Sequence, residues 1–296
     1  MKVGFIGTGN IGAPMAQQVL NAGYDLVVHD IRRESATPLL DGGATWASSP
    51  RRLAEQCDVI CSCLPGPREM EQVVFGDDGL FEGAGPGTVY VDMTTNSPSV
   101  VREAHTRLAK KSVAMLDAPV SGGMEGARTR DVTILVGGDE VTLTRVRPVL
   151  DAIGKTVIHV GDIGAGCIGK LTHNCAAFSV RQAMIECMTL GVKAGVEPAK
   201  VIEVFNRGAI GNNFDLRVRM AETIFKDDFE PRFALKLVDK DMRLAVELAA
   251  EHGVEMALAE LTQREIEEAM SRGWGDLDGS IYMTLQEERT GAKVRF

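Results

Sequence analysis

The sequence of 296 residues is poor in aromatic side chains, at 5%, and its acidic residues outnumber its basic ones, giving a formal net charge of −9. A protein that binds duplex DNA normally presents a basic face, so we expect no nucleic-acid partner. The same charge gives no general attraction to anionic membranes. No apolar run approaches the length of a membrane span, and the first residues lack a signal-peptide pattern. We therefore expect a cytoplasmic protein without a membrane partner.

Cysteine is also scarce, and its six copies include no Cys-x-x-Cys pair. Two of them, Cys61 and Cys63, fall in an apolar run, where cysteine behaves as a small hydrophobic residue. This usage favours reduced core thiols over a redox site. The His, Asp and Glu residues show no grouping with the spacing of metal ligands, so the sequence predicts no metal site.

Short apolar runs alternate with helical patterns through the N-terminal half. This alternation predicts a parallel sheet covered by helices on both faces. After Gly161 the pattern indicates helices alone. The expected fold class is an α/β Rossmann-type doubly wound sheet over residues 1–162, followed by an all-α C-terminal domain over residues 163–296. The expected strands are Lys2–Ile6, Asp25–His29, Val59–Cys63, Val89–Val91, Ala114–Leu116, Val132–Val136 and Thr156–Val160.

A glycine turn follows the first expected strand and opens a helix. Gly7, Gly9 and Gly12, with Asn10 and Ile11 between them, match the pattern G-x-G-x-x-G. The pattern alone is weak, because ordinary turns match it, but its place between a strand and a helix is typical of dinucleotide binding. The first glycine allows a tight turn, the second lets the backbone approach a pyrophosphate, and the third allows close packing of helix on strand.

The second expected strand ends at Asp30, about 20 residues beyond the glycine turn. A carboxylate there can accept hydrogen bonds from the adenosine ribose and repels a 2′-phosphate, which favours NAD. Arg32 and Arg33 follow directly and could bind that phosphate, or they could be solvated surface charges. We expect NAD as the preferred cofactor, with NADP possible.

Two further loops follow expected strands of the sheet. Leu64-Pro65 closes one strand, and Thr94–Asn96, which includes Thr95, follows the next. Ligands of such sheets bind outside the carboxyl ends of the strands, so both loops are candidates for the cofactor site. The threonines could instead cap the following helix, although Ser97, before Pro98, is the expected N-cap.

Lys170 and Asn174 lie four residues apart, on one face of an otherwise apolar expected helix. A lysine on a buried helix is costly unless it has a partner or a chemical role. An ordinary lysine there could instead extend its ammonium to solvent. His173 falls on a different face and is expected to be structural.

Four ordered blocks closely resemble the 3-hydroxyisobutyrate dehydrogenase, or β-hydroxyacid dehydrogenase, family. The first is the glycine turn, and the second is DAPVSGG, Asp117–Gly123, continuing into Gly126-Ala127. The third is Gly164-x-Gly166 with Lys170 and Asn174, and the fourth is Lys240-Asp241 with Leu244-Ala245. The match covers nearly the whole chain. Departures are Ile11 where the family usually has Met, and Arg130-Asp131 where Gly and a small hydroxyl residue are common.

The resemblance implies an NAD(P)-dependent oxidoreductase that interconverts a small 3-hydroxy acid and its semialdehyde. It implies that Ser121, Gly122 and Gly123 hold the substrate carboxylate, as a small-residue loop with backbone donors can. Lys170 would be the general acid/base, with Asn174 orienting it or the substrate oxygen, and Lys240 would lie near the cofactor. Burial, the helix N-terminus and the oxidised nicotinamide would each lower the pKa of the lysine from its usual ~10.4.

Other functions on the same scaffold are an imine reductase, a decarboxylating 6-phosphogluconate-type enzyme and a non-catalytic dinucleotide-binding module. Imine reductases usually lack the lysine, and the phosphogluconate enzymes have a larger helical domain. The resemblance therefore favours the dehydrogenase. The long helix is apolar over much of its surface, which predicts a homodimer or homotetramer joined through residues after Gly161.

Overall fold

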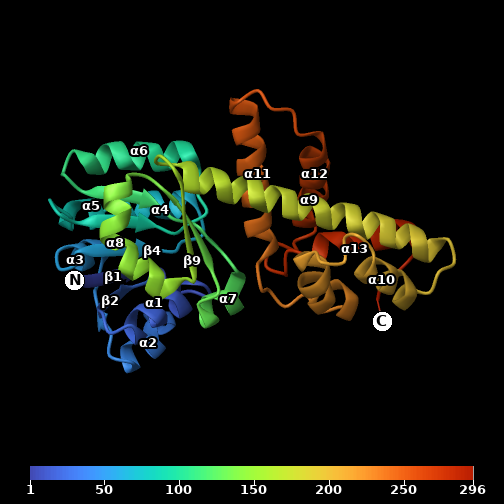
Figure 1. The fold of residues 1–296 in the computed structure, drawn as a ribbon, viewed down its shortest axis with the longest axis horizontal. Helices are drawn as coiled ribbons and strands as arrows, with labels where there is room; N and C mark the ends of the chain where they lie inside the picture. The colour runs from blue at the N-terminus through green and yellow to red at the C-terminus, as the bar shows by residue number, and fades with distance from the viewer. Residues whose placement is uncertain (296) are drawn as a thin grey trace. The chain divides into compact units, whose positions relative to one another are not determined.

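The computed structural model describes residues 1–295, which form two compact units that divide after Lys170. The first unit is α/β and the second is helical. One long helix, α9 (Ala165–Lys193), begins in the first unit and ends in the second (Figure 1). The sequence-based boundary after residue 162 stays a prediction. No helix in the described part of the chain is long and apolar enough to cross a membrane.

The described residues of the first unit form one nine-stranded sheet in the order β3-β2-β1-β4-β5-β6-β8-β7, with β9 paired to β8. Strands β1 to β6 pair in parallel along this order, which confirms the Rossmann-type fold class. The strands are β1 (Lys2–Ile6), β2 (Asp25–His29), β3 (Thr45–Trp46), β4 (Val59–Ser62), β5 (Val89–Asp92), β6 (Ala114–Asp117), β7 (Val120–Ser121), β8 (Thr133–Gly137) and β9 (Thr156–Gly161).

Alternate side chains of each central strand pack into two separate cores, one on each face of the sheet. In β1, Val3 and Phe5 pack into one cluster, whereas Ile6 packs into the other. Strand β5 does the same, with Val89 in the first cluster and Tyr90 in the second. A sheet buried on both faces must be apolar on both, which explains why these strands read as continuous hydrophobic runs.

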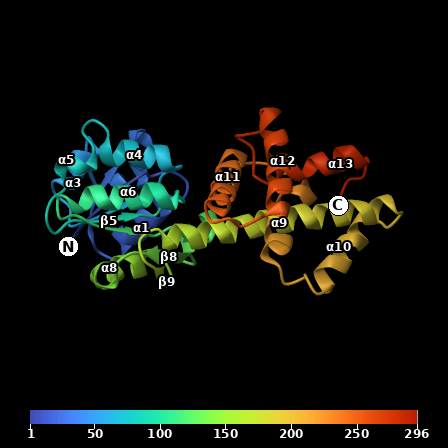
Figure 2. The same cartoon turned by 90° about the horizontal axis from the view of Figure 1, so that it is seen from above.

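Helices cover the two faces in separate sets. The first cluster is completed by residues of α1 (Gly12–Asn21), α2 (Thr37–Asp41), α7 (Gly123–Thr129) and α8 (Glu140–Ile153). The second is completed by residues of α3 (Pro50–Ala54), α4 (Pro67–Phe75), α5 (Leu80–Gly83) and α6 (Pro98–Ala109). Helices α4, α5 and α6 lie together in both views of the first unit (Figures 1 and 2). A short 3-10 turn, Arg33–Ala36, precedes α2.

Three details differ from the expectation. The sheet is mixed, because β8 pairs antiparallel with β6 and β7, so a purely parallel sheet was wrong. The two-residue strands β3 and β7 were missed, since so short a run carries no periodicity. Ser97 does occupy the N-cap position of α6, but its hydroxyl bonds to Ser99 and makes no capping hydrogen bond.

The second unit consists of helices, as expected, and α11 and α12 run side by side within it (Figure 1). Its core includes Ile185 and Met188 of α9 and Val238 of α11, all buried. The segment Asp215–Met220 is a six-residue π-helix. The elements after α9 are α10 (Pro198–Arg207), the π-helix Asp215–Met220, the 3-10 turns Ile224–Lys226 and Ile281–Met283, α11 (Leu235–Glu251), α12 (Ala257–Ser271) and α13 (Thr284–Thr290).

Candidate active site

The glycine turn joins β1 to α1, and its three glycines have different reasons to lack a side chain. Gly7 has a φ of +89°, and a Cβ there would lie against the carbonyl of Cys63. A Cβ at Gly12 would lie 1.9 Å from the Gly7 carbonyl oxygen. A Cβ at Gly9 would meet no heavy atom within 4 Å. The fold therefore requires Gly7 and Gly12, whereas Gly9 borders open space, as close approach by a pyrophosphate demands.

The start of α1 offers backbone N–H groups without a competing side chain. Asn10 is exposed, and Ile11, at the N-cap position, makes no side-chain capping hydrogen bond. Ile11 packs partly against the first core cluster, so this departure from the family pattern is accommodated by burial. Helix starts of this kind favour phosphate groups through their N–H donors and the helix dipole. The turn thus fits a dinucleotide.

Asp30 lies just beyond β2 and is bonded to the glycine turn. Its carboxylate accepts hydrogen bonds from the Thr8 amide at 2.7 Å and from the Arg32 amide at 2.9 Å. Arg33 lies over the ring of Trp46, 5.5 Å from its centroid, while Arg32 is exposed. Asp30 is therefore fixed beside the turn, at the place where the pattern predicts a ribose contact.

The loops after β4 and β5 contact each other. The Leu64 amide donates to the Thr94 hydroxyl at 3.1 Å, and Thr94 is 1% exposed. Thr94 therefore joins the two loops, and the helix-capping alternative does not describe its hydroxyl. Pro65 is exposed and Thr95 is half-buried, so both border the loop surface.

Sequence reasoning missed the residue that organises this pair of loops. Asp92, at the end of β5, is fully buried and accepts from the Ser62 hydroxyl, the Thr94 amide and the Asn96 side chain at 2.9–3.2 Å. Burial raises the pKa of this carboxyl, and the donated hydrogen bonds oppose that rise. The available signal was an acid at the end of an apolar strand, where a buried carboxylate needs donors.

The Ser121–Gly123 loop leads from β7 into α7. Ser121 pairs with Thr133 of β8, which anchors the loop at its start. Gly122 and Gly123 have φ values of +145° and +66°, so each also has a conformational reason to be glycine. Ser121 and Gly123 are half-buried and Gly122 is exposed, which leaves a hydroxyl and backbone at the loop surface.

The side chains of Arg130 and Asp131, where the chain departs from the family pattern, pair with residues outside this loop. Arg130 ends α7 with a φ of +63°, and its guanidinium donates to the Asp151 carbonyl of α8 at 2.7 Å. The Asp131 carboxylate lies 3.7 Å from the Lys155 ammonium. The backbone of Asp131 does approach the loop, because its carbonyl oxygen would lie 2.8 Å from a Cβ at Gly122.

Lys170 and Asn174 lie one turn apart on α9, and each is only 8% exposed. In the second unit, the Asn174 amide donates to the Asp241 carboxylate at 2.6 Å. Asp241, on α11, is 1% exposed, and its other oxygen lies 2.8 Å from the Lys240 ammonium. The third and fourth sequence blocks therefore meet through Asn174 and Asp241. Asp241 was missed as a site residue because only the fold brings it to Asn174.

Four of the six cysteines are buried as expected, and Cys63 is half-buried. Cys57, Cys61, Cys167 and Cys175 are buried, and burial raises the pKa of Cys57 and of Cys61 to about 12. Cys187 is exposed, so its assignment to the core was wrong. Among residues 1–295, no group of three or more His, Cys, Asp and Glu side chains could hold a metal ion.

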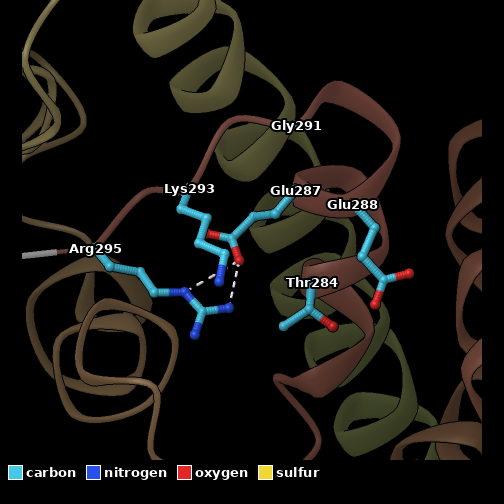
Figure 3. Close-up of a pocket in the computed structure, with 6 residues that line it drawn as sticks. All are labelled: Thr284, Glu287, Glu288, Gly291, Lys293 and Arg295. Atoms are coloured by element: carbon cyan, nitrogen blue, oxygen red, sulfur yellow. Dashed lines mark hydrogen bonds and ion pairs between the residues drawn. The ribbon is translucent and has the colours of Figure 1, made fainter.

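Two hollows of the second unit lie apart from the predicted site residues. A groove of about 530 Å³ has an apolar lining that includes Met184 and Cys187 of α9 and Phe205 of α10. A polar pocket of about 240 Å³ lies where the chain returns past α13 (Figure 3). There the buried Glu287 accepts from the Val294 amide at 2.7 Å and pairs with Arg295 at 2.6 Å, which fastens the C-terminal segment.

Both parts of the chain match models of known protein families. A model described as the NAD binding domain of 6-phosphogluconate dehydrogenase matches residues 2–161. One described as NAD-binding of NADP-dependent 3-hydroxyisobutyrate dehydrogenase matches residues 164–285. A solved structure of 3-hydroxyisobutyrate dehydrogenase from Salmonella typhimurium is 30% identical, with a TM-score of 0.87, covering 96% of this chain and 99% of that one. The chain belongs to the 3-hydroxyisobutyrate dehydrogenase family.

Relatives in this family carry different substrate names. The chain is 33% identical to 2-(hydroxymethyl)glutarate dehydrogenase of Eubacterium barkeri, over 99% of this chain and 97% of that protein. It is also 33% identical to NAD-dependent L-serine dehydrogenase of Pseudomonas aeruginosa, over 98% and 99% of the two chains. The chain is therefore an NAD(P)-dependent oxidoreductase of CH–OH groups, and its family membership confirms the resemblance and the enzyme class.

Proposed function

We propose that this enzyme interconverts a small 3-hydroxy acid and its semialdehyde, with Lys170 as the general acid/base. The observation that carries the proposal is the placing of Lys170 and Asn174. Both are polar, both are 8% exposed, and they lie one turn apart on α9. A nearly buried lysine next to an amide that is itself held by Asp241 fits proton transfer better than a solvated surface role.

The names of the relatives favour one chemical skeleton. 3-Hydroxyisobutyrate, L-serine and 2-(hydroxymethyl)glutarate all contain a primary alcohol next to a carbon that carries a carboxylate, HOCH2–CH(R)–COO⁻, and differ only in R. The substrate proposed for this chain is an acid of that form. Its carboxylate would be bound by the Ser121 hydroxyl and by the backbone of Gly122 and Gly123.

In the oxidation direction, the neutral Lys170 amine accepts the proton of the substrate hydroxyl while the carbon–hydrogen bond breaks. The nicotinamide, when bound, supplies the acceptor for the hydride. In the reduction direction, the Lys170 ammonium donates that proton to the developing alkoxide. The amide nitrogen of Asn174 donates to Asp241, and its side-chain oxygen would serve to orient the lysine or the substrate hydroxyl.

The residues proposed to hold the dinucleotide are those of the glycine turn and the neighbouring loops. Gly7, Gly9, Gly12, Asn10 and Ile11 form the phosphate-binding turn. Asp30 would accept from the ribose hydroxyls and thereby favour NAD. Leu64, Pro65 and Thr95 border the loops at the strand ends, and Lys240 would lie near the nicotinamide half.

We also propose that the protein is a cytoplasmic homodimer or homotetramer joined through its second unit. The support is apolar surface that is costly to leave in water. Val180 and Ile210, which line the apolar groove, are 40% and 46% exposed, and Leu190, Val204 and Phe214 of the same unit are 68%, 66% and 59% exposed. Light scattering is expected to give a multiple of the monomer mass. A monomer at micromolar concentration would contradict this assembly.

The catalytic proposal is tested with Lys170→Ala and Lys170→Arg, against Lys193→Ala as a matched control on the exposed last turn of α9. A panel of HOCH2–CH(R)–COO⁻ acids is assayed with NAD and NADP. Loss of acid–base assistance is expected to lower turnover by about 10²–10⁴-fold in Lys170→Ala. Lys170→Arg should not restore it, because a guanidinium stays protonated.

The oxidation rate of the wild type should rise with pH, and that limb should disappear in Lys170→Ala. NADH binding should survive in all variants, which shows that they are folded. Near-normal turnover by folded Lys170→Ala would show that another group transfers the proton.

A further inference from the structure

Asp117 ends strand β6 and is 0% exposed, although it carries a carboxyl group. One carboxylate oxygen accepts the Gly164 amide at 2.7 Å, and the other accepts the Cys167 amide at 2.7 Å. Both donors belong to the first turn of α9 or directly precede it, where N–H groups have no partner within the helix. Asp117 therefore holds the start of the helix that carries Lys170, which lies three residues beyond Cys167.

The packing around this contact leaves no room for adjustment. A Cβ at Gly166 would lie 2.8 Å from the Asp117 carbonyl oxygen, and one at Gly137 would lie 2.7 Å from the Gly166 amide. The backbone of the first turn of α9 thus rests directly on the ends of β6 and β8. Small shifts of the carboxylate are transmitted to the helix, because no flexible side chain lies between them.

The same residue begins the chain segment that leads to the substrate loop. The amide of the next residue, Ala118, donates to the Asp92 carbonyl at 2.7 Å. The Pro119 carbonyl accepts from the Leu135 amide at 3.0 Å, and β7 then ends at Ser121. Three residues lie between Asp117 and Ser121, and both ends of that short segment are fixed. A single side chain thus stands at the junction of the loop and the helix.

A cap alone does not require a buried carboxylate. The starts of α3 and α8 are capped by Ser49, which accepts from Arg52, and by Asp139, which is exposed and accepts from Thr142. Burial raises the pKa of Asp117, so the fold bears a desolvation cost there that it avoids at the other two helices. Two rigid acceptor oxygens define the position of a helix end more tightly than one hydroxyl can.

We propose that Asp117 is a positioning residue that sets the place of Lys170 relative to the Ser121–Gly123 loop by binding the first turn of α9 with both carboxylate oxygens. The proposal rests on the proposed function, in which the lysine and the loop act on one substrate. The negative charge of the Asp117 carboxylate at the helix start also favours the ammonium form of a lysine on that helix.

The test compares Asp117→Asn with Asp139→Asn, a matched control that weakens the N-cap of α8 in the same unit. Asparagine keeps the size but places one N–H2 group against a helix amide. We expect Asp117→Asn to lower kcat by about 10²-fold, as a misplacement near 1 Å can, with NADH affinity within about twofold of wild type. The rising limb of the oxidation pH profile should move to lower pH. Asp139→Asn should change neither kcat nor the profile.

A purely structural cap would lower thermal stability in both variants and leave kcat and the pH profile of Asp117→Asn unchanged, which would overturn the proposal. If Asp117→Asn does not fold, Asp117→Ser, which adds no opposing N–H group, is measured in the same way. Unfolding of both variants would make Asp117 a folding determinant and would also overturn the proposal.

Hydrogen exchange separates this proposal from the proposed function. In Asp117→Asn, exchange should accelerate both at residues 164–171 and at residues 120–124, and in Asp139→Asn at neither. If the wild type acts on no acid, or Lys170→Ala stays active, the proposed function fails while this coupling is still measured. If exchange accelerates at the helix start alone, the loop is not positioned by Asp117 and the inference fails by itself.

Discussion

Alanine substitution at Gly9 and at Gly12 should separate cofactor binding from folding within one turn. At Gly12 the new Cβ would lie 1.9 Å from the Gly7 carbonyl oxygen and 3.3 Å from the Phe5 ring, so the backbone itself must shift. Overpacking of this kind typically costs ~1–3 kcal/mol. For a unit of this size that corresponds to a fall in Tm of about 2–12 °C. At Gly9 there is no neighbour within 4 Å, so stability should change by less than ~0.5 kcal/mol.

For NADH affinity we expect the specific loss at Gly9, the position where stability should not change. A methyl group on Gly9 occupies the space that a pyrophosphate would fill and weakens its bonds to backbone N–H groups. Charge-assisted hydrogen bonds are worth ~1.5–3 kcal/mol, so NADH should bind about 10- to 150-fold more weakly to folded Gly9→Ala. The assays are thermal unfolding and NADH fluorescence titration. Wild-type NADH affinity in Gly9→Ala, or equal losses of stability in the two variants, would refute this reasoning.

Three further results are expected. Asp30→Ala should reduce a wild-type preference for NAD over NADP, measured as the ratio of kcat/KM values, and a wild-type preference for NADP would show that the neighbouring arginines dominate. Iodoacetamide at about pH 8 should label Cys57 and Cys61 far more slowly in the native protein than in the unfolded chain, because burial raises each pKa to about 12 and leaves a thiolate fraction on the order of 10⁻⁴. Burial also raises the pKa of Asp92, so the native state binds that proton more tightly than the unfolded chain does. The free energy of unfolding of the wild type, relative to that of Asp92→Asn, should therefore increase as the pH falls from about 7 toward 4. Urea unfolding of both proteins across this range checks the sign.

Much of the first unit could be predicted because its strands and helices have different sequence patterns. The strands expected at Lys2–Ile6 and Asp25–His29 occur with the expected bounds. The start of α9 at Ala165 could not be predicted with the same precision. The physical cause is that its first turn is held by Asp117, and local propensity does not register a distant cap.

The site could be predicted only where its residues are adjacent in the chain. The glycine turn and the Lys170–Asn174 pair depend on spacings of a few residues, which a sequence displays directly. Asp241 and Asp92 act through contacts with residues that the fold brings to them: Asn174 lies 67 residues from Asp241, and Ser62 lies 30 from Asp92. A carboxylate in an apolar segment indicates that donors must exist, but not which segment supplies them.

Three buried acids join segments that lie far apart in the sequence. Asp92 joins the loops after β4 and β5, Asp117 joins β6 to the start of α9, and Asp241 joins α11 to Asn174. Each acid accepts a hydrogen bond from a donor in another segment, and Asp92 and Asp241 also pair with neighbours in their own segment. Each therefore helps to fix the position of a loop or helix. A buried carboxylate is costly when it is unpaired. Misplacement of a segment that supplies its donors is therefore penalised. We therefore expect the placement of Lys170 to depend on Asp117, which binds the first turn of the helix that carries it.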